Sequence, residues 1–169
     1  FKKTGNPLDL AIHGDGFFVV GTPGGERYTK NGNFQMDPTG QLVTRNGDPV
    51  LSDGGEPFFL SPEDTSIDIA SDGTLSTENG VLGKLALVGF ENRHDMHLVA
   101  GGLYSSRQQA VPVENPNVTQ GMLESSNIQP VVEMTRMIEV HRSYESIKSF
   151  VEREDERQKQ MIREMARVA

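Results

Sequence analysis

The stretch His13–Val20, with the sequence HGDGFFVV, joins a turn to a strand and sets the pattern for most of the chain. Gly14-Asp15-Gly16 favours a turn, because glycine adopts positive φ without steric cost and Asp tolerates turn geometry. The apolar run Phe17–Val20 has high β propensity. His13 and Asp15 could form a reactive dyad, but no serine lies at a spacing that indicates a catalytic triad. The interpretation as a turn is therefore preferred, and together with Asn6–Ile12 before it the stretch is predicted to form a β-hairpin.

Turns of the same kind punctuate the chain from Asp9 to Ser105, and most recur about every 8–10 residues, the rhythm of an all-β sandwich or barrel. They are Gly14–Gly16, Pro23–Gly25, Asn31–Gly32, Asp37–Gly40, Asn46–Pro49, Ser52–Gly55, Ser71–Gly73 and Glu78–Gly80. The strands expected between them are Leu8–Ile12, Phe17–Val20, Arg27–Thr29, Asn33–Met36, Leu42–Thr44, Pro49–Leu51, Phe58–Leu60, Ile67–Ala70, Thr74–Ser76, Lys84–Phe90, His97–Val99 and Leu103–Ser105. Lys84–Phe90 is the most apolar run and predicts a core strand, whereas residues 106–121 are polar and predict a loop or an extended return segment.

The C-terminal part of the chain predicts one long helix. No Gly occurs after Gly121 and no Pro after Pro130. Asn127 fits an N-cap, which places Pro130 in the first turn, where its missing N–H costs nothing. A helix of this length would reach roughly 60 Å. We therefore predict a β-rich domain over residues 1–121, which includes the polar return segment, and a helical segment over residues 122–169.

The helix carries an apolar heptad seam. Its members recur at steps of three and four residues: Met137, Val140, Tyr144, Ile147, Val151, Met161, Met165 and Val168. Glu154 and Gln158 occupy the same register, so a polar gap over residues 152–160 interrupts the seam. Such a stripe is stabilised by packing on a partner, and it runs too far for one small domain to cover. The seam is therefore the predicted assembly interface.

Composition excludes several classes of function. The 169 residues contain no cysteine, which excludes disulfides and thiolate metal sites. No apolar run reaches the length of a membrane span, and the first residues contain no apolar core of a secretory signal. Residues 1–129 carry 16 acidic and 8 basic side chains, and residues 130–169 carry 8 of each. No basic face is evident, so nucleic acid is not an expected partner.

Motifs for catalysis and cofactor binding are lacking. His94 and His97 form an H-x-x-H pair around Asp95, but no third ligand follows at a fixed spacing that would predict zinc. The Asp-Gly turns do not follow the EF-hand pattern. His141 lies beside the seam and fits an interface or surface position. We find no P-loop, dinucleotide fingerprint or G-x-S-x-G, and expect no catalytic residue, cofactor, metal or small-molecule substrate.

Two long segments resemble one family. Thr4–Ile12, Gly14–Val20, Tyr28–Phe34 and Gly40–Thr44 resemble the start of the β domain in bacterial flagellar rod and hook proteins. Leu123–Met134 and Met137–Glu145 resemble the C-terminal helix of that family. The short β domain and the segment Gln129–Glu139 (QPVVEMTRMIE) are most similar to the proximal-rod member of the family, and the distal-rod member is second.

The resemblance implies a structural subunit. Members of the family are exported through the flagellar type III apparatus without a cleaved signal, and they assemble helically with copies of themselves and with other rod proteins. The resulting rod crosses the periplasm, transmits torque and encloses an export channel. An N-terminal helix and the C-terminal helix form an inner coiled coil. That N-terminal helix would precede Phe1, so the resemblance predicts one half of a coiled-coil domain here.

Two other functions stay open at this point. A non-catalytic β-domain binding module for glycan or protein, with a helical oligomerisation tail, would also explain the turn-rich acidic domain. A cell-wall hydrolase using Asp15 or Asp72 is the third hypothesis, because some flagellar proteins must open peptidoglycan.

Overall fold

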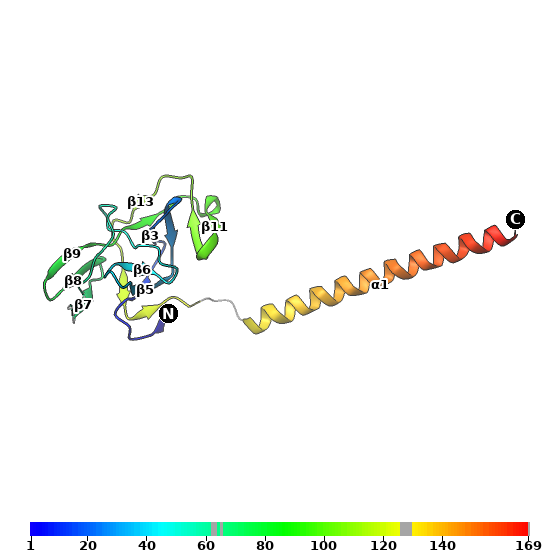
Figure 1. Cartoon of the computed structure of the whole chain (residues 1–169), viewed down its shortest axis with the longest axis horizontal. Helices are drawn as coiled ribbons and strands as arrows, with labels where there is room; N and C mark the ends of the chain where they lie inside the picture. Colours follow the sequence, from blue (N-terminus) through cyan, green and yellow to red (C-terminus); the bar gives the residue numbers. More distant parts are fainter. Residues whose placement is uncertain (62–63, 65, 126–129, 169) are drawn as a thin grey trace. The chain divides into compact units, whose positions relative to one another are not determined.

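The computed structural model describes residues 1–61, 64, 66–125 and 130–168. The chain divides into two compact units, Phe1–Ser125 and Ser126–Ala169, which are treated separately below (Figure 1). The first unit is built of β-strands and the second contains one long helix, α1 (Pro130–Val168). This confirms the predicted class, mainly β with a long C-terminal helix.

The described residues of the β unit form four antiparallel sheets, none of which closes on itself. The largest has the order β11-β12-β4-β3-β10-β13, followed by a four-stranded sheet β14-β2-β5-β6, a three-stranded sheet β7-β8-β9 and the pair β1-β15. Their bounds are β1 Lys2–Lys3, β2 Asp9–Ile12, β3 Phe17–Thr22, β4 Gly25–Thr29, β5 Gly32–Met36, β6 Leu42–Thr44, β7 Ile67–Ile69, β8 Thr74–Thr77, β9 Gly80–Lys84, β10 Leu87–Gly89, β11 His97–Val99, β12 Leu103–Ser105, β13 Val111–Pro112, β14 Val118–Gln120 and β15 Met122–Leu123.

Strand β3 lies near the middle of the largest sheet and is buried on both faces. Phe18 and Val20 enter the main core, where the Phe18 ring meets Phe34 edge-on at a centroid distance of 5.0 Å. Phe17 and Val19 point the other way into a second apolar cluster with Tyr28. A strand covered on both faces is expected to be apolar at every position rather than alternating. The unbroken run Phe17–Val20 has this pattern.

The turn before β3 connects two sheets. Phe17–Val20 and the residues before His13 do form strands, but β2 pairs with β5 and β14, whereas β3 pairs with β4 and β10. The prediction that this stretch is a β-hairpin is therefore wrong. Residues on either side of Gly14–Gly16 pack into one core from different sheets, so the turn acts as a corner between them.

Four further segments differ from the prediction. The run Lys84–Phe90 is split between β9 and β10, because Leu85 and Ala86 turn to form backbone hydrogen bonds with Gly73 and Leu51. Residues 106–121 include two strands, of which β14 pairs with β2 across a long sequence separation. Pro49–Leu51 and Phe58–Leu60 contribute isolated bridges instead of full strands.

The β unit ends beside its own beginning. β15 pairs with β1 in antiparallel register, with Lys2 opposite Leu123 and Lys3 opposite Met122. Gly121 O accepts backbone hydrogen bonds from Thr4 N (2.9 Å) and Gly5 N (3.2 Å). Residues 122–125 thus belong to the β unit, four residues beyond the boundary predicted from sequence, because this pairing ties them to the first strand. The predicted N-cap Asn127 lies outside the described residues.

Candidate functional site

All seam residues of α1 whose side chains the structure describes are exposed to solvent. Met137, Val140, Tyr144, Ile147, Val151, Met161 and Met165 are each between 53% and 71% exposed. Val168 is the last residue of the helix, and its side chain lies outside the described part. The flanking residues Met134, Ile138, Phe150 and Ile162 are also more than half exposed. Exposed apolar surface of this extent, on both sides of the polar gap, is typical of a protein–protein interface.

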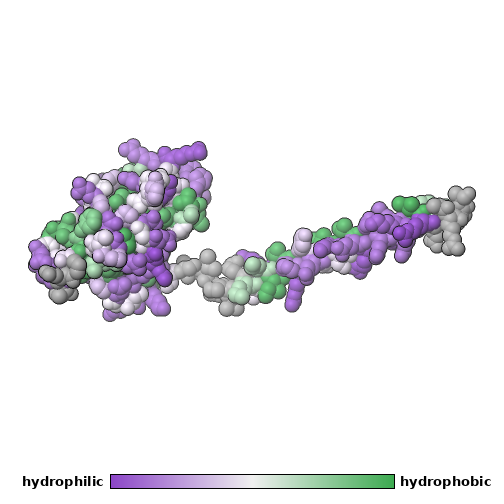
Figure 2. Space-filling model, viewed as in Figure 1, coloured by the Kyte–Doolittle hydropathy of each residue, from purple (hydrophilic) through white to green (hydrophobic). Residues whose placement is uncertain are grey.

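The polar gap of α1 contains ion pairs between side chains of the same helix. The Arg157 guanidinium donates to Glu154 Oε1 at 2.6 Å, and Lys159 Nζ donates to Asp155 Oδ2 at 2.6 Å. The hydrogen bond to Asp155 raises the pKa of the Lys159 ammonium. Figure 2 shows apolar residues on the helix before and after a hydrophilic stretch. All these pairs lie in solvent and are of the i,i+3 or i,i+4 type, which supports the helix without covering its seam.

His13 and Asp15 do not form a dyad. His13 Nε2 lies 3.0 Å from Thr119 Oγ1, and its ring stacks at a tilt against Phe1. Asp15 instead forms an ion pair with Arg93. Each side chain has its own partner on a different strand or loop, which is an ordinary surface role.

Asp72 has the environment of a turn residue. Its carboxylate accepts hydrogen bonds from Thr74 N (3.0 Å) and Thr74 Oγ1 (2.9 Å). These bonds lower its pKa, with a smaller contribution from the Lys84 ammonium. A general acid in glycoside hydrolysis needs a raised pKa. Asp72 is shifted the opposite way, so its environment does not favour the hydrolase hypothesis.

The two histidines of the H-x-x-H segment lie in different elements, His94 in a short helix and His97 in a strand. Asn92 caps the short helix Arg93–Asp95 by accepting from His94 N, and His97 begins β11. Asp95 Oδ2 accepts from Gln108 Nε2 at 2.6 Å. Within the described residues, no three or more His, Asp or Glu side chains gather in a way that could hold a metal ion.

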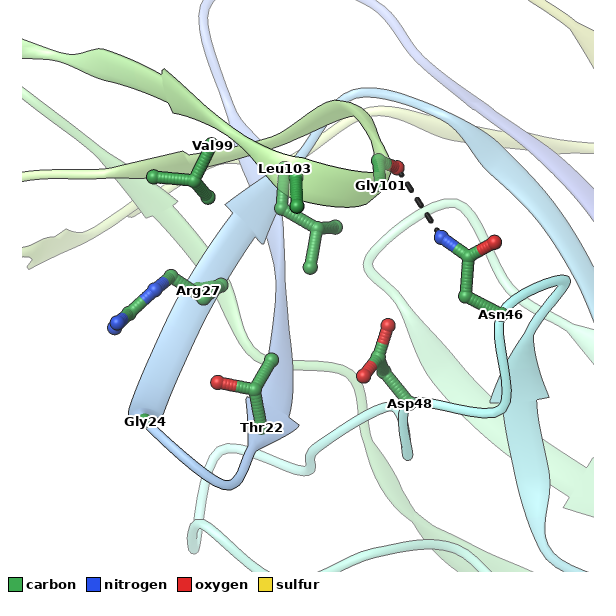
Figure 3. A pocket seen from close by; sticks show the side chains of 9 residues that line it. Thr22, Gly24, Arg27, Asn46, Asp48, Val99, Gly101 and Leu103 are labelled. Carbon is green, nitrogen blue, oxygen red and sulfur yellow. Dashed lines mark hydrogen bonds between the residues drawn. The ribbon is translucent and has the colours of Figure 1, made fainter.

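A shallow groove on the β unit was not predicted from sequence. It has a volume of about 560 Å³ and runs between the β3–β4 hairpin, the turn after β6 and the β11–β12 hairpin (Figure 3). Asn46 Nδ2 donates to Gly101 O at 3.3 Å across it. Figure 3 shows the Arg27 side chain pointing away from Asp48. Turn residues from distant segments form this groove, so no local sequence signal reveals it.

Among the described residues, no helix is both long enough and apolar enough to cross a bilayer.

Comparisons with known proteins match both parts of the chain. The family model described as flagellar hook protein FlgE/F/G D1 domain matches residues 11–77. The model described as flagellar basal body rod FlgEFG protein C-terminal matches residues 119–164 and therefore includes most of α1.

Relatives align over most of the chain. Flagellar basal-body rod protein FlgF of Caulobacter vibrioides is 37% identical, over 98% of this chain and 69% of the relative. FlgF of Salmonella typhimurium is 38% identical, over 84% of this chain and 62% of the relative. Flagellar basal-body rod protein FlgG of Bacillus subtilis is 33% identical, over 92% of this chain and 64% of the relative. The chain thus spans 62% to 69% of the length of these relatives.

These matches confirm the resemblance seen in the sequence, including its similarity to FlgF, the proximal-rod member. They give no support to the alternative of a free-standing binding module. The chain belongs to the family of bacterial flagellar basal-body rod proteins.

Proposed function

We propose that this chain is a structural axial subunit of the flagellar basal-body rod. It assembles helically with copies of itself and with neighbouring rod proteins, transmits torque and helps to enclose the export channel. It has no catalytic activity and uses no cofactor. The subunit is exported without a cleaved signal peptide and functions where the rod crosses the periplasm. The seam of α1 is its assembly surface.

The pairing of β1 with β15 is the observation that carries this proposal. β1 runs into the β unit while β15 runs out of it toward α1, and the two strands are hydrogen-bonded neighbours. The chain therefore enters and leaves the β unit at adjacent strands. In the proposed subunit, a segment that leads into β1 and the segment that follows β15 are tethered to neighbouring points, which favours pairing of helices on these two segments along their apolar seams. This supports the proposal of a coiled coil built from both ends of the chain.

The exposed seam supplies the reason for assembly. Fully burying an apolar side chain of this size contributes about 1.5–3 kcal/mol, and the seam offers seven described side chains that remain more than half exposed. A lone helix gains little of this energy, because its apolar face stays in water. Packing against neighbouring helices removes that surface from solvent and couples helix stability to assembly.

The test uses the complete protein in motile cells. Ile147→Asp and Tyr144→Asp each place a carboxylate in the seam and should abolish swimming in soft agar and recovery of the subunit in purified basal bodies. Ser149→Asp introduces the same charge two residues from Ile147, off the seam, and should leave both unchanged. Since Ile147 and Tyr144 are exposed in this chain, the isolated variants should melt within about 2 °C of the parent. Normal swimming of the seam variants would show that the seam is not the assembly surface.

A further inference from the structure

The polar gap lies in the seam itself. Glu154 follows Val151 by three residues, Gln158 follows Glu154 by four, and Met161 follows Gln158 by three. Residues with this spacing share one face of a helix. A partner helix that buries Val151 and Met161 therefore also covers Glu154 and Gln158.

Among the described residues, the ion-pair partner of Glu154 is Arg157, whose side chain lies largely in solvent. The Arg157 guanidinium bonds to Glu154 at 2.6 Å, and the side chains of Arg157 and Glu154 remain 69% and 38% exposed. An exposed pair at this spacing contributes little, because water solvates both groups well and the pair fixes two flexible side chains. It does not compensate for removing the carboxylate from water inside a helix interface.

A parallel pair of α1 helices is disfavoured by these positions. In a parallel, in-register coiled coil each seam residue faces its own copy. Glu154 would face Glu154 and Gln158 would face Gln158 at the centre of the interface. Like charges opposed in a partly dehydrated seam repel each other, so the gap opposes this form of self-association.

An antiparallel pair is disfavoured for a different reason. The antiparallel register that aligns the seam over its whole length sets Glu154 opposite Val151 of the second helix and Gln158 opposite its Ile147. Each carboxylate would then be dehydrated against an aliphatic side chain with no partner in the interface. In both symmetric arrangements the seam position that faces Glu154 on the second helix thus carries no cation.

We infer that α1 pairs across this stretch with a helix of different sequence that places a Lys or Arg side chain opposite Glu154. The cation would neutralise Glu154, and a single polar layer in an otherwise apolar seam fixes register and partner choice. The inference rests on the proposed role of α1 as a coiled-coil helix in the rod. It adds the chemistry of the partner, and it predicts that free subunits do not associate through α1.

Sedimentation of the 169-residue chain tests the effect on self-association. Glu154→Leu/Gln158→Leu makes the seam continuous and should lower the dimer dissociation constant at least about tenfold relative to the parent. The matched control Glu156→Leu/Gln160→Leu makes the same two changes on the opposite face and should leave association unchanged. Equal behaviour of the two double variants, or strong self-association of the parent, would overturn the inference.

A pair of synthetic peptides tests the partner's chemistry. Both peptides carry a Leu/Ile heptad seam, with either Lys or Glu at the position facing Glu154. In fluorescence anisotropy the chain should bind the Lys peptide at least about tenfold more tightly than the Glu peptide, and Glu154→Gln should remove most of that difference. Equal affinity of the parent for both peptides would refute the inferred counter-charge.

The seam variant Ile147→Asp separates this inference from the proposed function. It should weaken binding of both peptides. If Ile147→Asp binds the peptides as the parent does, the seam is not a helix-binding surface and the proposed function fails. If Ile147→Asp loses binding while the two peptides bind the parent equally, the seam stands and only the counter-charge at Glu154 is wrong.

Discussion

Gly32→Ala is expected to be among the most damaging single-methyl additions to the β unit. Gly32 lies opposite Leu10 where β5 pairs with β2. A Cβ atom at this position would lie 2.0 Å from Leu10 O and 2.8 Å from Leu10 C, and 3.1 Å from the Phe18 ring. The first two atoms are backbone, so no side-chain rotation relieves the contact. The strands must separate at this point.

The cost follows from what that separation disrupts. Overpacking a core position costs about 1–3 kcal/mol, and the upper end applies here because Leu10 and Phe18 are fully buried. The neighbouring pair Asp9 and Asn33 would also be strained, including the hydrogen bond from Asn33 Nδ2 to Asp9 Oδ1 at 2.6 Å. We expect a loss of about 3 kcal/mol, or a fall in Tm of about 10–15 °C for a domain of this size.

The assay is calorimetry and urea unfolding followed by near-UV circular dichroism. Gly54→Ala is the matched control, because Gly54 has no positive φ and its added Cβ would meet only Ser52 Oγ at 3.6 Å. That control should unfold within about 1 kcal/mol of the parent. If Gly32→Ala were as stable as Gly54→Ala, the close approach of β2 to β5 would be refuted.

Two further predictions concern carboxylates of the β unit. Hydrogen bonds from Thr39 Oγ1 and then from Gln41 N lower the pKa of Asp37, so this group stabilises the fold above its unfolded pKa and that contribution is lost as pH falls through the lower folded pKa. Asp37→Asn should therefore flatten the acid limb of the stability curve below about pH 4, which urea unfolding at a series of pH values would measure. Asp15→Ala removes an exposed ion pair with Arg93 and should cost less than about 1 kcal/mol without affecting motility. A motility defect in this variant, with stability retained, would instead assign Asp15 to a contact with a neighbouring subunit.

Local sequence predicted the elements that depend on neighbouring residues. Most of the Gly-Asp and Asn-Gly signals marked turns, but the turn predicted at Asn31–Gly32 is wrong, because Gly32 begins β5. The apolar run at Phe17–Val20 marked a strand. The stretch from Pro130 to Val168 has no internal Pro or Gly, and it forms a single helix. The seam could be read directly, since helical spacing alone places those residues on one face.

The same local signals failed where a choice among distant partners was needed. Asn6–Val20 reads as a hairpin because two strand-like runs flank a Gly-Asp-Gly turn, yet its strands enter different sheets. Lys84–Phe90 reads as one strand because every residue but two is apolar, yet backbone bonds to Gly73 and Leu51 divide it. The groove around Asn46 has no sequence signal, because it exists only where three separate turns meet.

By itself, then, the sequence determined most of the turn positions, most of the strand-forming runs, the long helix with its interrupted seam, and the family. Tertiary structure decided that β1 joins β15, that β2 joins β14, and that β3 is buried on both faces. The physical reason is the sequence separation over which the deciding interactions act. Turns and helical faces are fixed by torsional preferences and contacts within a few residues. Strand pairing joins residues more than a hundred positions apart, and only the shared burial of their side chains selects one partner over another.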